Sequence, residues 1–322
     1  MAFLARSFVV LCCLAAAVPL TAQREWHRWA FGEGAGITFV ENGRVLSVPK
    51  QSSRTPVFQS EGTASISDPC SGELLFTSDG YGVYGASGST LENGSMLLGE
   101  NSATQAALLL PHPADIDKYV LFTAPDRASG RAKPGTTCSW NIIDRAAMDG
   151  RGAVTRKNVP LPLATSERLC AVLRPDGVSY WVVMMTADTT VFRVYALDAG
   201  GVAATPVVSS FPFRSHNVGY MKVSPDGSKL AIASPLYGVE LFDFDMGTGS
   251  VSNRRVLLTD ENRNVIGAQV FYGLEWSPDG SKLYVSSRGI AAAVVQFDIA
   301  QGRNDLIAMS AAEVMRQSIA DV

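Results

Sequence analysis

The chain has 322 residues, of which 18% are charged, and a formal net charge of −3 at pH 7. It therefore lacks the concentrated basic surface that attracts phosphate backbones, and we expect no nucleic-acid partner. The 29 glycines and 16 prolines interrupt a sequence rich in Val, Ser and Thr, which favours short strands joined by tight turns over long helices.

Residues 1–22 have the pattern of a secretory signal peptide. The positive charge of Arg6 is followed by the apolar run Phe8–Leu20 and then by small residues. This run of about a dozen residues is too short to span a bilayer, and no later run reaches the ~20 residues that a spanning helix needs. We expect an exported protein without a transmembrane segment, located outside the cell, on its outer surface or in the periplasm.

The cysteines leave two interpretations open. A lipidated Cys12 or Cys13 is disfavoured because both lie early in the apolar run and lack the small residue expected before a lipid site. Cleavage would leave Cys70, Cys138 and Cys170, which allow at most one disulfide and a free thiol. The pairing stays open, and three buried apolar cysteines fit the sequence equally well.

Two strand–turn–strand units are predicted in the first half of the mature chain. Residues 64–68 and 73–77 form the first, and residues 106–110 and 119–123 form the second. Earlier still, residues 36–40 and 45–49 have the composition of strands.

A repeated turn gives the strongest signal in the sequence. Ser224–Leu230 recurs identically as Ser277–Leu283, and Arg174–Tyr180 is a weaker copy, with prolines 50 and 53 positions apart. In such a turn proline presets φ near −65°, aspartate accepts backbone hydrogen bonds, and glycine adopts a positive φ. The predicted turn residues are Pro175, Asp176, Gly177, Pro225, Asp226, Gly227, Pro278, Asp279 and Gly280.

Each late copy of the turn lies inside a group of strands. We predict strands over residues 220–223, 229–233, 239–245 and 251–258 around the second copy, and 273–276, 282–286 and 294–299 around the third. The alternation of apolar and charged residues over 239–245 predicts one packed and one wet face.

Four strands in a period near 50 residues predict an all-β fold, a β-propeller of four-stranded blades. Five complete blades begin near residues 62, 104, 168, 218 and 271, as part of a six- or seven-bladed ring over residues 23–322. We assign the strands at 36–40 and 45–49 to a blade shared between the termini. Residues 310–322 follow a third-strand pattern, so we expect either a C-terminally truncated domain or a short terminal helix that leaves the ring incomplete.

Several short segments of this sequence resemble those of a family of secreted Bacteroidetes proteins. In that family a WD40-like propeller precedes a gliding-motility or type IX secretion sorting domain. The resemblance rests on Trp29–Gly32 with Ala35–Ile37, Glu61–Asp68, Gly72–Gly80 and Ser102–Gln105, and it extends to Gly219–Gly227, Val239–Asp245 and Tyr272–Val285. It implies a surface-carried propeller without known catalytic residues. The family's next Pro-Asp-Gly-Lys blade and its sorting domain are absent from this sequence.

The chemistry-bearing residues do not form a recognised motif. His27, His112 and His216 lie far apart without metal-ligand spacing, and we interpret His112, between two prolines, as a loop residue. Asp243 and Asp245 share a strand face and could hold a cation, although a solvated face is favoured. We predict no catalytic residue, metal or cofactor.

Tryptophans near the mature N-terminus offer a second choice between function and packing. Trp26 and Trp29 could be exposed binding aromatics. For Trp29, which falls in a family-like word, packing between blades is favoured.

Two classes of function remain open, and the sequence does not decide whether the protein is an enzyme. The favoured one is a monomeric, non-enzymatic module that binds a protein or glycan with its loops. The alternative is a propeller hydrolase of the lactonase kind, with a divalent ion in the central channel. The first predicts a channel without convergent acids, and the second needs several carboxylates or amides meeting there.

Overall fold

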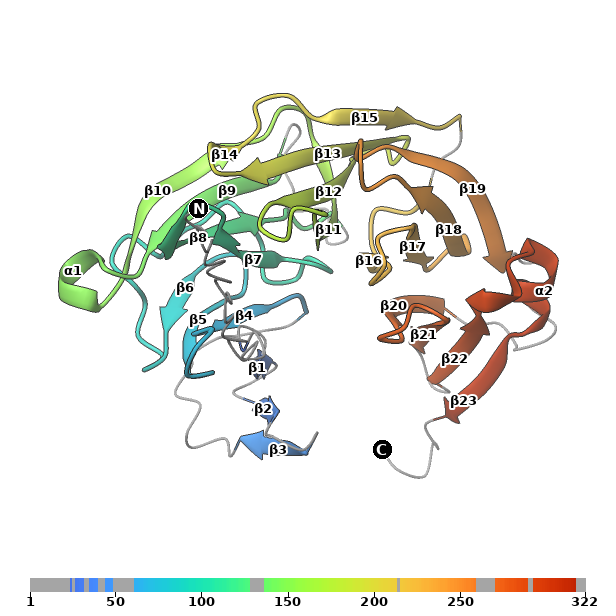
Figure 1. The fold of residues 1–322 in the computed structure, drawn as a ribbon, viewed down its shortest axis with the longest axis horizontal. Coiled ribbons are helices and arrows are strands. Elements are labelled where there is room, and N and C mark those ends of the chain that lie inside the picture. Colours follow the sequence, from blue (N-terminus) through green and yellow to red (C-terminus); the bar gives the residue numbers. More distant parts are fainter. Residues whose placement is uncertain are drawn as a thin grey trace, which may run out of the picture.

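The structure is a computed structural model that describes residues 24, 27–31, 35–39, 44–48, 61–127, 136–212, 215–258, 270–288 and 292–316. The predicted signal peptide, Cys12, Cys13 and Trp26 lie outside these residues. The described chain forms six antiparallel sheets, which follow one another around an axis as the blades of a β-propeller (Figure 1).

The first three blades hold strands β1 to β10. The first blade contains β1 (Arg28–Phe31), β2 (Ala35–Phe39) and β3 (Val45–Val48); the second contains β4 (Ala64–Ser67), β5 (Leu74–Ser78) and β6 (Val83–Gly85); the third contains β7 (Ala107–His112), β8 (Asp115–Thr123), β9 (Ser139–Asp144) and β10 (Ala153–Pro160).

The last three blades hold β11 to β23. The fourth blade contains β11 (Thr165–Leu173), β12 (Tyr180–Thr186), β13 (Val191–Asp198), β14 (Gly201–Val202) and β15 (Val207–Ser210); the fifth contains β16 (Met221–Val223), β17 (Lys229–Ser234), β18 (Gly238–Phe244) and β19 (Val251–Leu258); the sixth contains β20 (Val270–Trp276), β21 (Lys282–Arg288), β22 (Ala293–Asp298) and β23 (Ala312–Arg316).

Helices are few and short in the described residues. They are α1 (Ala147–Gly150), the 3-10 helix η2 (Ile299–Gln301) and α2 (Asn304–Met309). Within the described residues, no helix has the length and hydropathy needed to cross a membrane.

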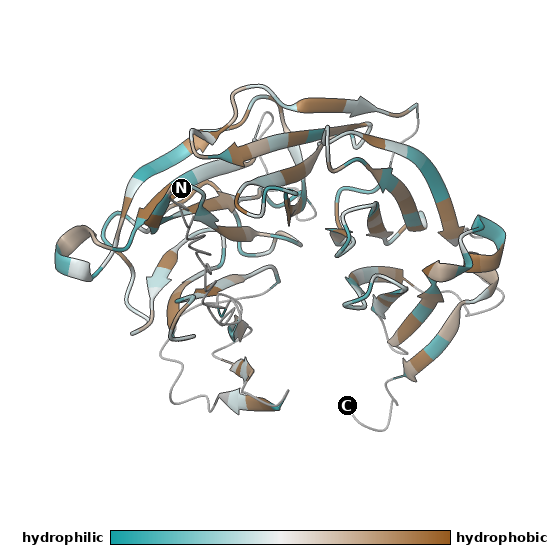
Figure 2. Cartoon of the chain, viewed as in Figure 1, coloured by the Kyte–Doolittle hydropathy of each residue, from teal (hydrophilic) through white to brown (hydrophobic). Residues whose placement is uncertain are grey.

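Hydrophobic packing between neighbouring blades holds the ring together. Alternation along the strands sends every second side chain into such a contact, as for Leu283 and Val285 of β21, which pack against Leu241 of the fifth blade. Each fully buried side chain of this size contributes about 2 kcal/mol. Figure 2 shows apolar residues along the inner strands and hydrophilic stretches on the outer strands β10 and β19.

The repeated Pro-Asp-Gly words occupy the turns between the first and second strands of the last three blades. In each turn the glycine N–H donates to the residue three positions earlier, at 2.9 Å, and Asp Oδ1 accepts from the residue two positions later. The glycines have φ of +70° to +73°, a region that costs a side chain about 1–2 kcal/mol. Hydrogen bonds from Ser179 to Asp176 and from Ser277 to Asp279, together with the backbone N–H groups, lower the pKa of these two aspartates to about 2.

Two details at the ends of the ring differ from the sequence-based expectation. Among the described residues, strands β2 and β3 form a sheet with β1 and with no strand from the C-terminal part of the chain. Residues 312–316 form β23, which completes the sixth blade, and the short helix α2 comes before it. The first and sixth blades lie at the two ends of the ring in Figure 1, and among described residues no sheet joins them.

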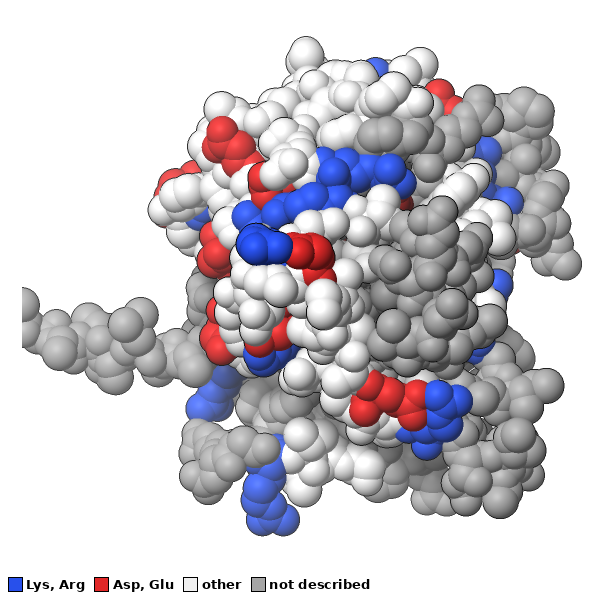
Figure 3. All heavy atoms as spheres, turned by 90° about the vertical axis from the view of Figure 1, so that its right-hand side faces the viewer, with Lys and Arg blue, Asp and Glu red and all other residues white. Residues whose placement is uncertain are grey.

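Charges on the outer side of the fifth and sixth blades are mixed. Figure 3 shows basic and acidic side chains next to one another on this face. Ion pairs account for several of them, including Arg255–Asp243 at 2.5 Å and Lys229–Asp243 at 2.9 Å. Solvent-accessible surface pairs of this kind contribute about 0–1 kcal/mol each. They leave no field of a single sign on this face (Figure 3).

Candidate functional site

The innermost strands β1, β4, β7, β11, β16 and β20 surround the axis, and their N-terminal ends are closed by a plug of polar side chains. Gln105, just before β7, is its centre. Its Oε1 accepts from Met221 N (3.0 Å) and Leu169 N (3.3 Å), and its Nε2 donates to Met221 O (3.1 Å). One side chain from the third blade thus pairs the free edges of two other inner strands.

Glu167 and Thr104 extend the plug. The fully buried Glu167 carboxylate accepts from Thr104 N and Oγ1, both at 2.8 Å, and from Arg127 N at 2.5 Å. The Thr104 hydroxyl also lies 2.9 Å from the Tyr272 hydroxyl, which donates to Glu61 at 2.6 Å. Because Glu61 precedes β4 and Tyr272 belongs to β20, these bonds link the second blade to the sixth across the axis.

The charge of Glu167 is balanced within the protein. Arg168 is fully buried, and its guanidinium donates to backbone carbonyls, including Val218 O at 2.7 Å. Burial lowers the pKa of Arg168 to about 10, and Glu240 and Glu167 oppose this shift. The axial carboxylate of Glu167 is therefore surrounded by protein donors.

Beyond the plug, the axis widens into a pocket of about 420 Å³, which we call the axial pocket. It runs from Gln105 to Val223, the last residue of β16, and so extends toward the face that carries the Pro-Asp-Gly turns. Its walls come from five inner strands and are mainly small, apolar or hydroxyl-bearing: Trp29, Ala30, Gly62–Ser65, Gln105, Ala107–Leu109, Leu169–Ala171, Tyr220, Lys222 and Val223.

Trp29 is the most exposed large side chain of the axial pocket. It is 46% exposed, and its ring meets Phe39 of the same blade edge-on at 5.0 Å. The prediction that Trp29 packs between blades was therefore wrong. An accessible indole above small residues can stack on a flat apolar group of a ligand.

Lys222 supplies the one basic side chain among the pocket-lining residues, and it forms an ion pair with Glu275. Tyr220, directly before β16 and two residues before Lys222, also lines the pocket and is half-buried. The pocket thus combines an aromatic face, hydroxyls and a neutralised cation, a composition typical of binding sites for neutral or weakly polar groups.

Hydroxyl groups of β4 and of Thr63, the residue just before it, fix the wall that carries Trp29. Thr63 Oγ1 donates to Ala30 O (3.3 Å), Ser65 Oγ donates to Arg28 O (3.1 Å), and Ser67 Oγ accepts from Arg28 N (3.3 Å). The period of two places all three hydroxyls on one face of β4. This hydroxyl ladder joins the first blade to the second.

The thiols are not activated nucleophiles. Cys170 lines the axial pocket, but burial raises its pKa to about 12; burial likewise raises the pKa of Cys138 to about 11. A thiolate is the reactive form, so both remain protonated at neutral pH. Cys70, Cys138 and Cys170 are all free, with Cys70 exposed.

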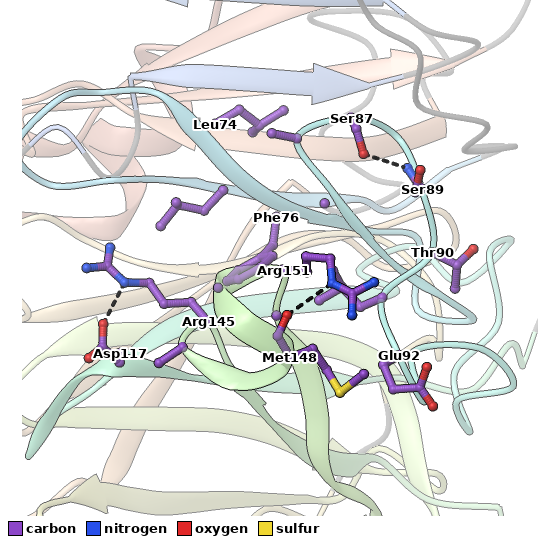
Figure 4. A pocket seen from close by; sticks show the side chains of 17 residues that line it. Leu74, Phe76, Ser87, Ser89, Thr90, Glu92, Asp117, Arg145, Met148 and Arg151 are labelled. Atoms are coloured by element: carbon purple, nitrogen blue, oxygen red, sulfur yellow. Dashed lines mark hydrogen bonds and ion pairs between the residues drawn. The ribbon is translucent and has the colours of Figure 1, made fainter.

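A larger recess of about 840 Å³ lies between the second and third blades (Figure 4). It opens where the second blade has three strands beside a four-stranded neighbour. Arg145 of this recess pairs with Asp117 (2.7 Å) and Asp68 (2.8 Å), and Arg151 donates to Met148 O (3.0 Å). Its basic groups are already engaged, and none of its lining residues is Trp, Tyr or His.

The histidines and acids singled out in the sequence are dispersed. His112 is the last residue of β7, not a loop residue. His216 lies near Arg168 and Arg288, where burial and then these charges lower its pKa. Asp243 pairs with Lys229 and Arg255, and Asp245 accepts turn N–H groups. In the described ranges, no three His, Cys, Asp or Glu side chains come together as metal ligands.

Sequence reasoning did not assign roles to Gln105, Thr104, Glu167 or Glu61. A signal was present, since Thr104, Gln105 and Glu61 fall in the words Ser102–Gln105 and Glu61–Asp68. The hydroxyls at 63, 65 and 67 also repeat with period two in Glu61–Asp68. The hydrogen-bond partners of the plug residues lie in other blades, and local patterns did not reveal them. The partner of Glu61, Tyr272, is 211 positions away in the sequence.

Comparisons with known proteins do not place the chain in a family. No protein-family model matches the sequence, and no curated protein matches it. Among solved structures, a candidate 6-phosphogluconolactonase of Bacteroides fragilis is 15% identical, with 88% of this chain and 77% of that chain covered and a TM-score of 0.49.

Two further structures have similar values. A candidate 6-phosphogluconolactonase of Bacteroides uniformis is 14% identical, over 90% of this chain and 81% of that one, with a TM-score of 0.47. The Cps50 (Swd1) β-propeller domain of Myceliophteria thermophila is 11% identical, over 90% and 85%, with a TM-score of 0.44. From its own sheets, this chain is an all-β, six-bladed propeller on the four-stranded blade plan, with three to five described strands in each blade.

Proposed function

We propose that the protein is a non-catalytic binding module that holds part of a protein or glycan ligand in the axial pocket. The proposal rests on a difference in accessibility between Trp29 and the carboxylate of Glu167. The indole is accessible in the pocket, whereas the axial carboxylate of Glu167 accepts hydrogen bonds from protein donors. Such a pocket can bind by stacking and shape without a reacting group.

The second candidate is a hydrolase of the lactonase kind. Glu167 and Glu61 lie on the axis, and two of the similar structures carry a lactonase name. A divalent ion needs several oxygen ligands at one point. Glu167 would have to give up its bonds to Thr104 and Arg127 to serve as one, which disfavours this candidate.

We further propose that the module acts outside the cytoplasm, at the cell surface, as a monomer. The N-terminal pattern of a signal peptide supports export. The resemblance to secreted gliding-motility and type IX secretion proteins supports display at the surface. Fractionation of cells that express the full chain, with surface protease treatment, tests this part independently of the ligand.

An array of glycans and peptides probed with the wild-type protein and with Trp29→Ala tests the binding proposal. We expect ligands that bind the wild type and lose about tenfold or more in affinity with Trp29→Ala, because the stacking surface is removed. Trp181→Phe, a change at a residue that lines neither the axial pocket nor the other recesses, is the matched control and should bind as the wild type does.

The hydrolase alternative has its own readout. Wild-type protein with Ca²⁺ or Mn²⁺ is incubated with glucono-δ-lactone, and turnover is measured beside Glu167→Gln. Ion-dependent turnover that Glu167→Gln abolishes would replace the binding proposal with the hydrolase.

A further inference from the structure

A second recess with different chemistry lies between the third and fourth blades at the outer part of the ring. Its volume is about 530 Å³, and we call it the basic groove. It lies away from the axis and shares no lining residue with the axial pocket. The lining residues are His112, Lys118, Trp140, Ile142, Thr155, Arg156, Val159–Pro162 and Gly200–Ala204.

Arg156 is the central feature of the basic groove. Its guanidinium carbon lies 4.3 Å from the centre of the Trp140 ring, and Trp140 itself is 8% exposed. In the part of the chain that the structure describes, no hydrogen bond or ion pair of the Arg156 side chain is present. Stacking holds the guanidinium plane while its N–H donors stay available, the arrangement that suits two-point binding of a carboxylate.

The backbone around Arg156 is built to place this side chain. Strand β10 has irregular register with β9 on both sides of Arg156, with one extra residue before it and one after it. Bulges of this kind redirect a side chain and are frequent beside functional sites.

Asn158 holds the second bulge in place. It adopts φ of +57°, and its N–H donates to Asn141 Oδ1 at 2.7 Å. Its side chain also accepts from Leu98 N (3.0 Å) and donates to Met96 O (3.1 Å). Three hydrogen bonds thus hold Asn158 in a backbone conformation that few residues adopt, so the surrounding structure fixes the shape of this bulge.

The charged side chains lining the basic groove, Lys118 and Arg156, are both positive. His112, Lys118 and Arg156 line it, and none of the lining residues is Asp or Glu. Lys118 pairs with Asp115 at 2.5 Å, and His112 Nδ1 accepts from Ala114 N at 3.2 Å, which leaves Nε2 as a donor in the neutral ring. Arg156 is therefore the cation best placed to bind an outside acid.

The remaining walls select among acidic ligands. Val159, Pro160, Leu161, Pro162 and Val202 are apolar. The face of Trp140 that could stack on a sugar ring is covered by Arg156. Apolar walls beside a single free guanidinium fit an acidic side chain flanked by apolar residues better than a polyhydroxylated sugar.

We propose that the basic groove binds an acidic peptide segment, with a carboxylate on Arg156 and neighbouring apolar side chains against the walls at Val159–Pro162 and Val202. The axial pocket and the basic groove are then separate sites. The proposal does not depend on the function of the axial pocket.

Fluorescence polarisation with the full chain tests it, using a fluorescein-labelled peptide Gly-Leu-Glu-Leu-Glu-Leu-Gly and the same peptide with Gln in place of Glu. We expect the acidic peptide to bind, the Gln peptide to bind about tenfold or more weakly, and Arg156→Gln to weaken the acidic peptide by about tenfold or more. Arg156→Lys, which keeps the charge without the planar fork, should be intermediate.

Arg174→Gln is the matched control. Arg174 also stacks on a tryptophan, at 4.4 Å from the Trp181 ring, but its guanidinium donates to Ser179 and it lies outside the groove. This variant and Trp29→Ala should bind the acidic peptide as the wild type does. Thermal melting of each variant separates lost binding from lost folding.

Three outcomes would overturn the proposal: no binding of the acidic peptide by the wild type, equal binding of the Gln peptide, or unchanged binding by a folded Arg156→Gln. Binding of oligogalacturonate that requires Arg156, without binding of the peptide, would assign the groove to an acidic glycan and also reject it.

Discussion

The two ends of the propeller axis use different kinds of residue for different purposes. At the plug, the side chains of Thr104, Gln105 and Glu167 are buried. Each of them makes a hydrogen bond to a residue of a blade other than its own. In the axial pocket, Trp29 is accessible and Lys222 makes an exposed ion pair. Residues at the plug should therefore control stability, whereas residues of the pocket should control binding.

Gln105→Leu should have the largest effect on stability. The variant keeps the approximate size of the side chain but leaves Met221 N, Leu169 N and Met221 O without their partner. We expect the free energy of unfolding to fall by about 3 kcal/mol, measured by urea denaturation. Lys222→Gln, at the other end of the axis, is the control and should change it by about 1 kcal/mol or less. Equal stability of Gln105→Leu and the wild type would remove the distinction between the two ends.

Tyr272→Phe should have a smaller effect that depends on pH. Loss of the bonds to Glu61 and Thr104 should cost about 1 kcal/mol at neutral pH. Burial, together with Glu61, raises the pKa of Tyr272 above its ordinary value of 10.0. The unfolded chain therefore loses this proton first, and the stability gained from Tyr272 is present below pH 10.0 and declines as the pH rises above it.

The difference in unfolding free energy between the wild type and Tyr272→Phe should accordingly shrink in denaturation series run above pH 10. Tyr272→Phe retains the other tyrosines, so their titration cancels in the comparison. A difference that stays constant across this range would show that the hydroxyl is not held in its protonated form.

Trp29→Ala should affect binding and leave stability nearly unchanged. The indole is 46% exposed and loses mainly its contact with Phe39. We expect a fall of about 1 kcal/mol or less in the free energy of unfolding. A large loss of stability would mean that Trp29 holds the first blade and is not free for a ligand.

Alkylation gives the smallest but most local effect. In the native protein at neutral pH, iodoacetamide should modify the exposed Cys70 first, followed on mass spectrometry by Cys138 and Cys170 only after denaturation. Native labelling of Cys170 as fast as Cys70 would indicate that the wall of the axial pocket opens.

The sequence was sufficient for the propeller because its main signal is local. The residues of each Pro-Asp-Gly turn determine its backbone conformation and its hydrogen bonds without help from distant residues. Strand β19 was also predicted with the residues that the structure shows. Strand β23 was missed because all five of its residues are exposed, so no alternation of burial marks it in the sequence.

The site was less accessible to prediction because it is assembled between blades. Glu61 and Tyr272 meet only when the ring has formed, and Trp29 is exposed only because its neighbours around the axis are small. The words that resemble secreted propellers contain Glu61, Thr104 and Gln105, so part of that resemblance now has a structural explanation. These residues close the axis and hold its strands together.

Hydrogen exchange of the wild-type protein with and without an array-selected ligand tests the binding account most directly. We predict that the ligand slows exchange in peptides from the inner strands β4, β7, β11 and β16, which line the axial pocket, and that Trp29→Ala abolishes this protection. Protection confined to the recess between the second and third blades, or no change along the inner strands, would contradict the assignment of the axial pocket as the binding site.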